Sequence, residues 1–410
     1  MLYYIFEKLK DFDIPGQGLM NYLSFRAIAA NVLAMLVALF FGKKVIEWLQ
    51  KKQIGETIRD LGLEGQMAKK GTPTMGGIII LVALLTAVLL LCDLSNIYIQ
   101  LLLLTSVWCG GLGFWDDYIK VFKHNKNGLS ETKKLLGQFC LGVIVAATVC
   151  FSPKIVVREQ VESAASAEGQ TELAEARETH EDVVKSTKTT IPFVKTHEFD
   201  YKYLSPFKGS LGWYSKWAIY ALVIIFILLA CSNGANLTDG MDGLSAGTSA
   251  IVAVVIGVLA WLGGNVLNAS YLNIMYIPAS GEIAVFMSAF VGALVGFLWY
   301  NTFPAQVFMG DTGSLMVGGI IGVSAVLIRK ELLLPILCGI FLVESLSVIL
   351  QRSWFKFTKR KYGEGRRLFR MAPIHHHFQK QNIPEAKIVT RFWLIGIVLA
   401  VSTLALLKIR

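Results

Sequence analysis

The chain has 410 residues, of which 54% are hydrophobic and 17% are charged, and its mean hydropathy is +0.55. This composition excludes a soluble globular protein of that length and is typical of a polytopic membrane protein. Lys and Arg exceed Asp and Glu by 39 to 29. Membrane orientation and anionic lipids explain the resulting net charge of +10, so no nucleic-acid partner is expected.

Ten apolar runs are long enough to predict membrane spans, each of which needs about 20 apolar residues. They lie near residues 22–49, 75–92, 97–115, 135–152, 216–232, 244–262, 283–300, 314–329, 332–350 and 389–408. Hydrocarbon admits only helices and closed barrels, and runs this long exclude barrel strands. The sequence therefore predicts an all-α integral membrane protein with about ten transmembrane helices.

Lys and Arg are concentrated in the links after the first, third and ninth runs. Because these are alternate links, they share one membrane face, and the excess of positive charge predicts that this face is cytosolic.

One link is much longer than the others and divides the chain. Residues 153–215 form an insertion on the opposite, outer face, between spans one to four (residues 1–152) and spans five to ten (residues 216–410). Its stretch 161–172 is rich in Ala, Glu and Ser, which favours a disordered or accessory segment without chemistry of its own.

The first cytosolic link ends in Lys69 and Lys70, followed by a Gly- and Pro-containing entry to the second span at residues 71–77. Glycine there permits close backbone approach. Either lysine could meet a phosphate as a mobile point charge or serve only as a membrane anchor.

Asp116 and Asp117 end the third span. An acid near the bilayer centre costs roughly 2.5 to 3.5 kcal/mol, so the pair belongs at the membrane edge or in a wet cleft. Adjacent helical residues point about 100° apart. One aspartate can thus face a cleft while the other pairs with Lys120, although a simple ion pair at the helix end is the alternative.

The link between the fifth and sixth spans carries Asp239 and Asp242 among glycines. It lacks the remaining ligand positions of an EF-hand. Contacts to a substrate or phosphate ester fit this loop better, and a structural Asx-turn is the alternative.

Asp311 stands in the segment 301–315, where Thr-Gly-Ser follows it and a new apolar run begins. This pattern predicts a helix N-terminus, whose free N–H groups favour phosphate. The carboxylate could hold Mg²⁺ beside that phosphate or act only as a helix cap.

Three consecutive histidines, His375, His376 and His377, follow the ninth span. Zinc ligands converge on one ion, whereas three neighbours on a regular element diverge. Contact with a diphosphate or sugar, with one histidine titrating near neutral pH, is the preferred interpretation. Together with the aspartates on the same face, the loops predict a metal-dependent phosphoryl-transfer site where a soluble diphosphate meets a lipid.

Five segments in this order resemble the phospho-N-acetylmuramoyl-pentapeptide transferase family, within the polyprenyl-phosphate N-acetylhexosamine-1-phosphate transferase superfamily. They are residues 71–77, 116–117, 236–244, 301–315 and 373–378. The resemblance covers nearly the whole chain apart from residues 153–215, an insertion longer than expected for the family. It implies a multi-pass protein of the bacterial inner membrane with a cytosol-facing active-site cleft.

The resemblance also implies the reaction. Undecaprenyl phosphate attacks the β-phosphorus of UDP-MurNAc-pentapeptide, giving lipid I and UMP with Mg²⁺, the first membrane step of peptidoglycan synthesis. The implied catalytic residues are Asp116, Asp117 and Asp311, with Asp311 as the Mg²⁺ ligand. The implied substrate-binding residues are Lys69, Asn236, Asp239, Gly240, Asp242, Asn301, Phe308, His375, His376 and His377.

Several alternatives stay open at this point. Asp117 could orient or deprotonate the lipid phosphate, or an aspartate could form a covalent phospho-enzyme. A sister transferase using UDP-GlcNAc would share the aspartate loops, although the segment 373–378 argues against it. A secondary transporter would predict inverted repeats, which the sequence does not show. The sequence does not decide between a monomer and a homodimer.

Overall fold

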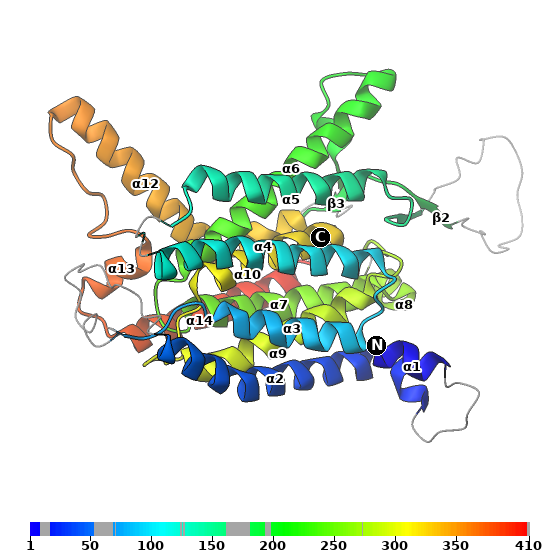
Figure 1. Cartoon of the computed structure of the whole chain (residues 1–410). Coiled ribbons are helices and arrows are strands. Elements are labelled where there is room, and N and C mark those ends of the chain that lie inside the picture. Colours follow the sequence, from blue (N-terminus) through cyan, green and yellow to red (C-terminus); the bar gives the residue numbers. More distant parts are fainter. Residues whose placement is uncertain are drawn as a thin grey trace, which may run out of the picture.

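The computed structural model describes residues 1–8, 17–52, 69, 71–123, 125, 128–160, 181–192, 198–272 and 274–407. Lys70 and the stretch 161–172 lie outside these residues. The long helices are α2 (Leu23–Lys51), α3 (Gly77–Leu91), α4 (Ile97–Phe122), α5 (Glu131–Phe151), α6 (Gly209–Thr238), α7 (Leu244–Gly263), α9 (Gly281–Asn301), α10 (Gly310–Leu327), α12 (Gly339–Tyr362) and α14 (Glu385–Ala405). Most of them run side by side along a common direction in Figure 1, whereas α6 and α12 are inclined to the others.

Short helical elements connect the long helices. They are α1 (Leu2–Lys8), η1 (Gln17–Asn21), η3 (Tyr201–Leu204), α8 (Val266–Leu272), η4 (Glu331–Leu333), α11 (Leu334–Leu337) and α13 (Ile374–Gln379).

The helices account for the predicted apolar runs, and the all-α polytopic membrane fold is confirmed. Among the described residues, eight helices are long and apolar enough to span a membrane. The segment from η4 to α12 makes a ninth if its two parts, bent by 77°, count as one span. The predicted run at 75–92 forms α3, which has only 15 residues, so the count of ten is not confirmed.

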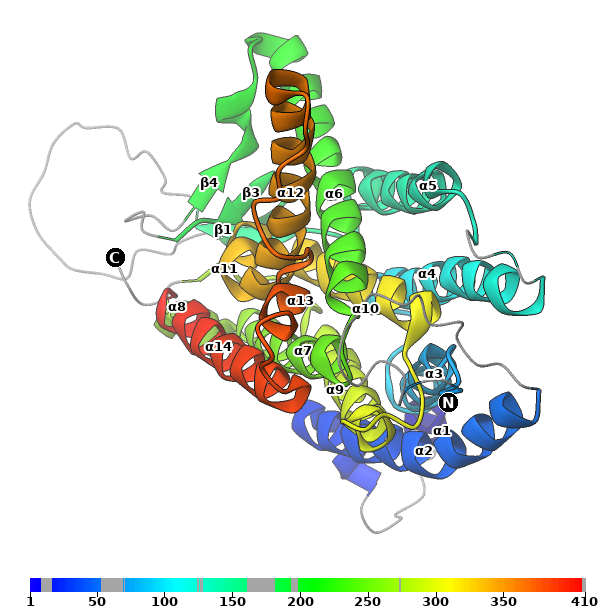
Figure 2. The same ribbon diagram turned by 90° about the vertical axis from the view of Figure 1, so that its left-hand side faces the viewer.

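Helix α10 lies at the centre of the bundle, next to α4, α6 and α7 (Figure 2). Small residues allow its neighbours to approach closely. A Cβ on Gly77 of α3 would lie 2.1 Å from the backbone nitrogen of Gly313, and a Cβ on Gly318 would lie 2.2 Å from the carbonyl oxygen of Cys231. These contacts fix α10 and hence the position of Asp311 in its first turn.

The described part of the insertion forms two antiparallel strand pairs. Strand β1 (Val157–Gln160) pairs with β2 (Glu181–Val184), and β3 (Lys188–Thr190) pairs with β4 (Glu198–Asp200). The sequence had favoured a disordered or accessory segment here. The strands lie at the end of the bundle opposite to α13 (Figure 1).

Strand β3 covers three charged residues that follow α10. Arg329, Lys330 and Glu331 are at most 3% exposed. The backbone N–H of Thr190 donates to the carbonyl of Arg329 at 3.0 Å, and Lys330 donates to the Thr190 hydroxyl. The Tyr201 hydroxyl donates to Glu331 at 3.2 Å. The insertion therefore supplies hydrogen-bond partners to the buried Lys330 ammonium and Glu331 carboxylate.

Candidate active site

Asp117 joins the end of α4 to the start of α10. The two helices touch at Gly113, where a Cβ would lie 2.1 Å from the carbonyl oxygen of Asp311. One turn further along α4, Asp117 Oδ1 accepts the backbone N–H of Asp311 at 3.2 Å. Its Oδ2 accepts the N–H and the hydroxyl of Thr312 at 2.9 and 2.6 Å. A carboxylate is stabilised in this position by the free N–H groups and dipole of the helix N-terminus.

Asp116 and Asp311 share two ammonium groups. Lys120 Nζ lies 2.6 Å from Asp116 Oδ2 and 3.2 Å from Asp311 Oδ2. Lys134 Nζ lies 2.9 and 2.5 Å from the same two oxygens. The sequence suggested Lys120 as a partner for one aspartate, and the structure pairs it with Asp116. Lys134, in the first turn of α5, was missed because it is one of several lysines in a basic link.

The three aspartates form a group of oxygen donors. One carboxylate oxygen from each of Asp116, Asp117 and Asp311 lies within 4.8 Å of the other two. Within the described part of the chain, no other three His, Cys, Asp or Glu side chains bring their ligand atoms this close together. Hard oxygen donors at this spacing fit Mg²⁺. Three carboxylates and two ammonium groups leave one net negative charge, so a bound divalent cation would make the cluster positive enough to attract a diphosphate.

Asn236, in the last turn of α6, orients Asp311. Its Nδ2 donates to Asp311 Oδ1 at 2.9 Å and to the Ser314 hydroxyl at 2.8 Å. Residues from α4, α5, α6 and α10 thus meet around one carboxylate. The sequence named Asn236 as a substrate-binding residue, and the structure places its amide against the aspartate group.

A second cluster surrounds Lys69. Its Nζ lies 2.6 Å from Asp242 Oδ1 and 2.6 Å from Glu385 Oε1, and 5.8 Å from the centre of the Phe308 ring. The other oxygen of Asp242 accepts the backbone N–H of Ala305 at 3.0 Å. Two carboxylates therefore already neutralise the lysine that was expected to approach the uridine or diphosphate. Glu385, the first residue of α14, was missed because nothing in the sequence links it to a loop 316 positions earlier.

Asn301 ties two site loops together. It is 3% exposed, its Oδ1 accepts the N–H of Gly243 at 3.0 Å, and its Nδ2 donates to the carbonyl of Val307 at 2.9 Å. The Asn301 amide is therefore occupied by hydrogen bonds within the protein.

Two further predicted substrate-binding residues are partly exposed. They are Asp239, which follows directly after α6, and Phe308.

The first histidine of the triplet is buried against the loop after α6. His375 is fully buried, and its Nδ1 lies 3.1 Å from Oε2 of the equally buried Glu344 on α12. A Cβ on Gly240 would lie 2.2 Å from His375 Nε2. The loop therefore depends on glycine for this contact. Glu344 was missed, although an acid inside the apolar run 332–350 is a signal in its own right.

The other two histidines have different partners, although the centres of the His375 and His376 rings lie only 4.2 Å apart. His376 Nδ1 lies 3.1 Å from Gln379 Oε1, and His377 Nδ1 accepts the backbone N–H of Arg370 at 3.1 Å. Burial and the adjacent His375 lower the pKa of His376 to about 4. His376 is therefore neutral at physiological pH.

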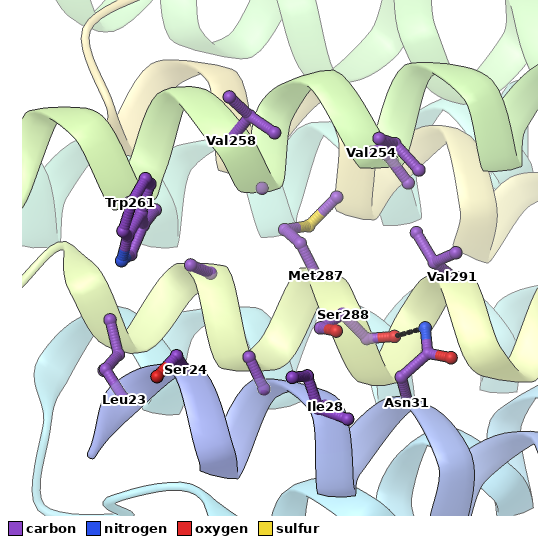
Figure 3. Close-up of a pocket in the computed structure, with 14 residues that line it drawn as sticks. Leu23, Ser24, Ile28, Asn31, Val254, Val258, Trp261, Met287, Ser288 and Val291 are labelled. Carbon is purple, nitrogen blue, oxygen red and sulfur yellow. Dashed lines mark hydrogen bonds between the residues drawn. The ribbon is translucent and has the colours of Figure 1, made fainter.

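A groove of about 330 Å³ lies between α2, α7 and α9, away from these clusters. Its lining is mostly apolar and carries no ionisable side chain, and Asn31 donates to the carbonyl of Ser288 at 2.8 Å (Figure 3). It contains none of the predicted site residues.

Two family models and several curated proteins match this chain. A family described as glycosyl transferase family 4 matches residues 183–329, and signature 1 of phospho-N-acetylmuramoyl-pentapeptide transferase matches residues 69–81. Three curated relatives bear that transferase name and align over their full length and all of this chain. They come from Parabacteroides distasonis (54% identical), Flavobacterium psychrophilum (53%) and Porphyromonas gingivalis (51%). The chain belongs to the phospho-N-acetylmuramoyl-pentapeptide transferase family.

Proposed function

We propose that this chain transfers phospho-MurNAc-pentapeptide from UDP-MurNAc-pentapeptide to undecaprenyl phosphate, giving lipid I and UMP. The observation that carries the proposal is the convergence of Asp116, Asp117 and Asp311 at the ends of membrane-spanning helices. A water-soluble diphosphate and a lipid phosphate can meet only at such an edge. Full-length relatives named for this transfer support the MurNAc-pentapeptide donor over UDP-GlcNAc.

In the proposed reaction, an oxygen of the lipid phosphate forms a bond to the β-phosphorus. The bond from that phosphorus to the bridging oxygen breaks, and UMP carries away the electron pair. Because the lipid phosphate is already an anion near neutral pH, at most its last proton has to be removed. Asp117, with Thr312 and the α10 N–H groups on its oxygens, is suited to orienting the acceptor.

Asp311, with Asp116 and Asp117, would hold Mg²⁺, which supplies charge neutralisation on the diphosphate when bound. Lys120 and Lys134 lie on the same carboxylates and can turn to the phosphate oxygens. The Lys69, Asp242 and Phe308 cluster would receive the uridine, and the histidine loop would receive the diphosphate or sugar. The concentration of Lys and Arg in alternate links supports a cytosolic location for this face, in a bacterial inner membrane.

The test is UMP release by the purified full-length chain, with undecaprenyl phosphate and either sugar nucleotide. Release with UDP-MurNAc-pentapeptide only is expected, and release with UDP-GlcNAc only would overturn the donor assignment. Radiolabelled donor without lipid phosphate separates the two mechanisms, since a trapped phospho-MurNAc-enzyme requires the covalent route. Strict dependence of UMP release on the lipid supports direct attack.

A further inference from the structure

Gln138 of α5 is a fully buried side chain that the proposed reaction does not use. Its Nε2 donates to the Ser232 hydroxyl on α6 at 3.0 Å, and that hydroxyl donates to the carbonyl of Leu315 on α10 at 3.0 Å. Its Oε1 accepts a hydrogen bond from Asn233 Nδ2 at 2.9 Å. Hydrogen bonds between polar side chains hold membrane helices to one another. This network therefore ties α5 to α6, and α6 to α10.

The network lies one helical turn, about 5.4 Å, further into the bundle than the candidate active site. Gln138 follows Lys134 by four positions on α5, so the two side chains share a face of that helix. On α6, Ser232 precedes Asn236 by the same interval. Lys134 and Asn236 both contact Asp311 of α10. A displacement of α5 that broke the bonds of Gln138 would therefore also move the Lys134 ammonium.

Helix α5 lies at the edge of the bundle, so few contacts hold it in register. Its main neighbour among the described elements is α6 (Figure 2). A Cβ on Gly142 would lie 3.2 Å from the Cα of Ile225, which shows how closely these two helices pack. Towards α4, Trp108 Nε1 donates to the carbonyl of Gly137 at 2.9 Å, and this bond is exposed. The bonds of Gln138, in contrast, are made inside the bundle.

We propose that Gln138 is a positioning residue that holds the Lys134 ammonium between Asp116 and Asp311. The ammonium lies 2.9 and 2.5 Å from oxygens of these two carboxylates. It therefore occupies charge that a bound cation would otherwise use. Without the bonds of Gln138, α5 can shift and the ammonium withdraws. The inference rests on the proposed function, because that function places Mg²⁺ at the same carboxylates.

The experiment is a double-substitution cycle on the purified full-length chain. Gln138→Met removes the hydrogen bonds of the amide at similar side-chain volume, and Lys134→Gln removes the ammonium itself. The affinity for Mn²⁺ is measured by electron paramagnetic resonance in the parent chain, in each single variant and in the double variant. Because neither substrate is present, the result does not depend on transferase activity. A parent chain that binds no Mn²⁺ would overturn the proposed metal site and this inference with it.

We expect Gln138→Met to raise the Mn²⁺ affinity of the parent chain about threefold, by partial removal of a competing charge. In the Lys134→Gln background it should have no further effect, since the group through which it acts is already absent. General damage to the site would instead lower the affinity in both backgrounds. An equal effect of Gln138→Met in the two backgrounds, or no effect in either, would overturn the proposal.

Two further variants complete the test. Ser232→Ala removes one hydroxyl and breaks the network between α5 and α10. It should act in the same direction as Gln138→Met, and it provides the measurement if that variant does not fold. Asn31→Leu is the matched control, because its amide ties α2 to the carbonyl of Ser288 on α9, away from the aspartates. The control should bind Mn²⁺ as the parent chain does, and an increase in its affinity equal to that of Gln138→Met would contradict a specific role for Gln138.

Discussion

Thr312 donates two hydrogen bonds to Asp117, a residue 195 positions earlier in the chain. The hydrogen bond from the backbone N–H of Thr312 cannot be removed by a side-chain substitution, whereas the hydrogen bond from its hydroxyl can. Thr312→Val keeps the shape of the side chain and should lower kcat for UMP release about 10- to 100-fold, since a hydrogen bond to a charged group contributes about 1.5 to 3 kcal/mol. Steady-state kinetics with both substrates measure the change.

Thr105→Val is the matched control for that variant. Thr105 is buried on the same helix as Asp117, but its hydroxyl donates only to the carbonyl of Leu101 in its own helix. Its activity should stay near that of the parent protein. Equal losses in both variants would mean that the hydroxyl of Thr312 has no particular role.

Lys134→Gln should bind a divalent cation more tightly and yet release UMP more slowly. The substitution removes an ammonium that lies between Asp116 and Asp311. At this separation the lost charge is worth roughly 1 to 4 kcal/mol, so Mn²⁺ affinity by electron paramagnetic resonance should rise about tenfold. The adjacent Lys133→Gln removes an exposed charge and should change neither quantity. Unaltered Mn²⁺ binding in Lys134→Gln would mean that the Lys134 ammonium does not compete with a metal ion for Asp116 and Asp311.

Asp311→Asn should abolish stabilisation of the protein by Mg²⁺. A ligand that binds only the folded state raises the melting temperature, and this variant loses one of three carboxylate donors. Thermal unfolding with and without Mg²⁺ gives the answer without an activity assay. Asp93→Asn, in the link between α3 and α4 and bonded to Tyr4, is the control and should retain the shift. A full Mg²⁺ shift in Asp311→Asn would rule out its assignment as a metal ligand.

Gly240→Ala should displace His375. The added Cβ would lie 2.2 Å from the imidazole Nε2, closer than any real contact, and the ring is held on its other side by Glu344. We expect kcat for UMP release to fall at least about tenfold, as misplacement of a site residue does. In Gly111→Ala the new methyl meets nothing within 4 Å, so full activity is expected there. Normal kinetics in Gly240→Ala would mean that the position of His375 is unimportant.

Acid should destabilise the protein through His376. Its folded-state pKa is about 4 against an ordinary value of 6.5, so the unfolded chain binds more protons between these two values. Stability is therefore lost as the pH falls from 6.5 towards 4, by on the order of 2 kcal/mol. His376→Gln should flatten the dependence of the melting temperature on pH over this range. A slope that survives in His376→Gln would assign the acid sensitivity to other groups.

The sequence was sufficient to predict most of the long helices and to expect the three aspartates at their ends, although not the number of spans. An apolar run long enough to span the membrane must form a helix, because its backbone groups have no water to bond in the hydrocarbon. Asp117 and Asp311 each stand at an end of such a run, so their place at one end of the bundle follows. The 77° break before α12 was not predicted, because one apolar run continues through it.

The sequence does not predict which side chains contact the site residues. Lys134 and Glu385 resemble any charged residue at a helix start, and only packing brings them to Asp311 and Lys69. Glu344 could have been found, because an acid within an apolar run requires a partner. Asn301 was predicted to line the site, whereas its amide is used to hold two loops.

The insertion at residues 153–215 limits how far this enzyme can be trimmed. A shortened chain without β3 and Tyr201 would leave the buried Lys330 and Glu331 without the partners that Thr190 and Tyr201 provide, at the far end of the helix that carries Asp311. Attempts to obtain a minimal catalytic core for inhibitor screening should therefore retain this segment.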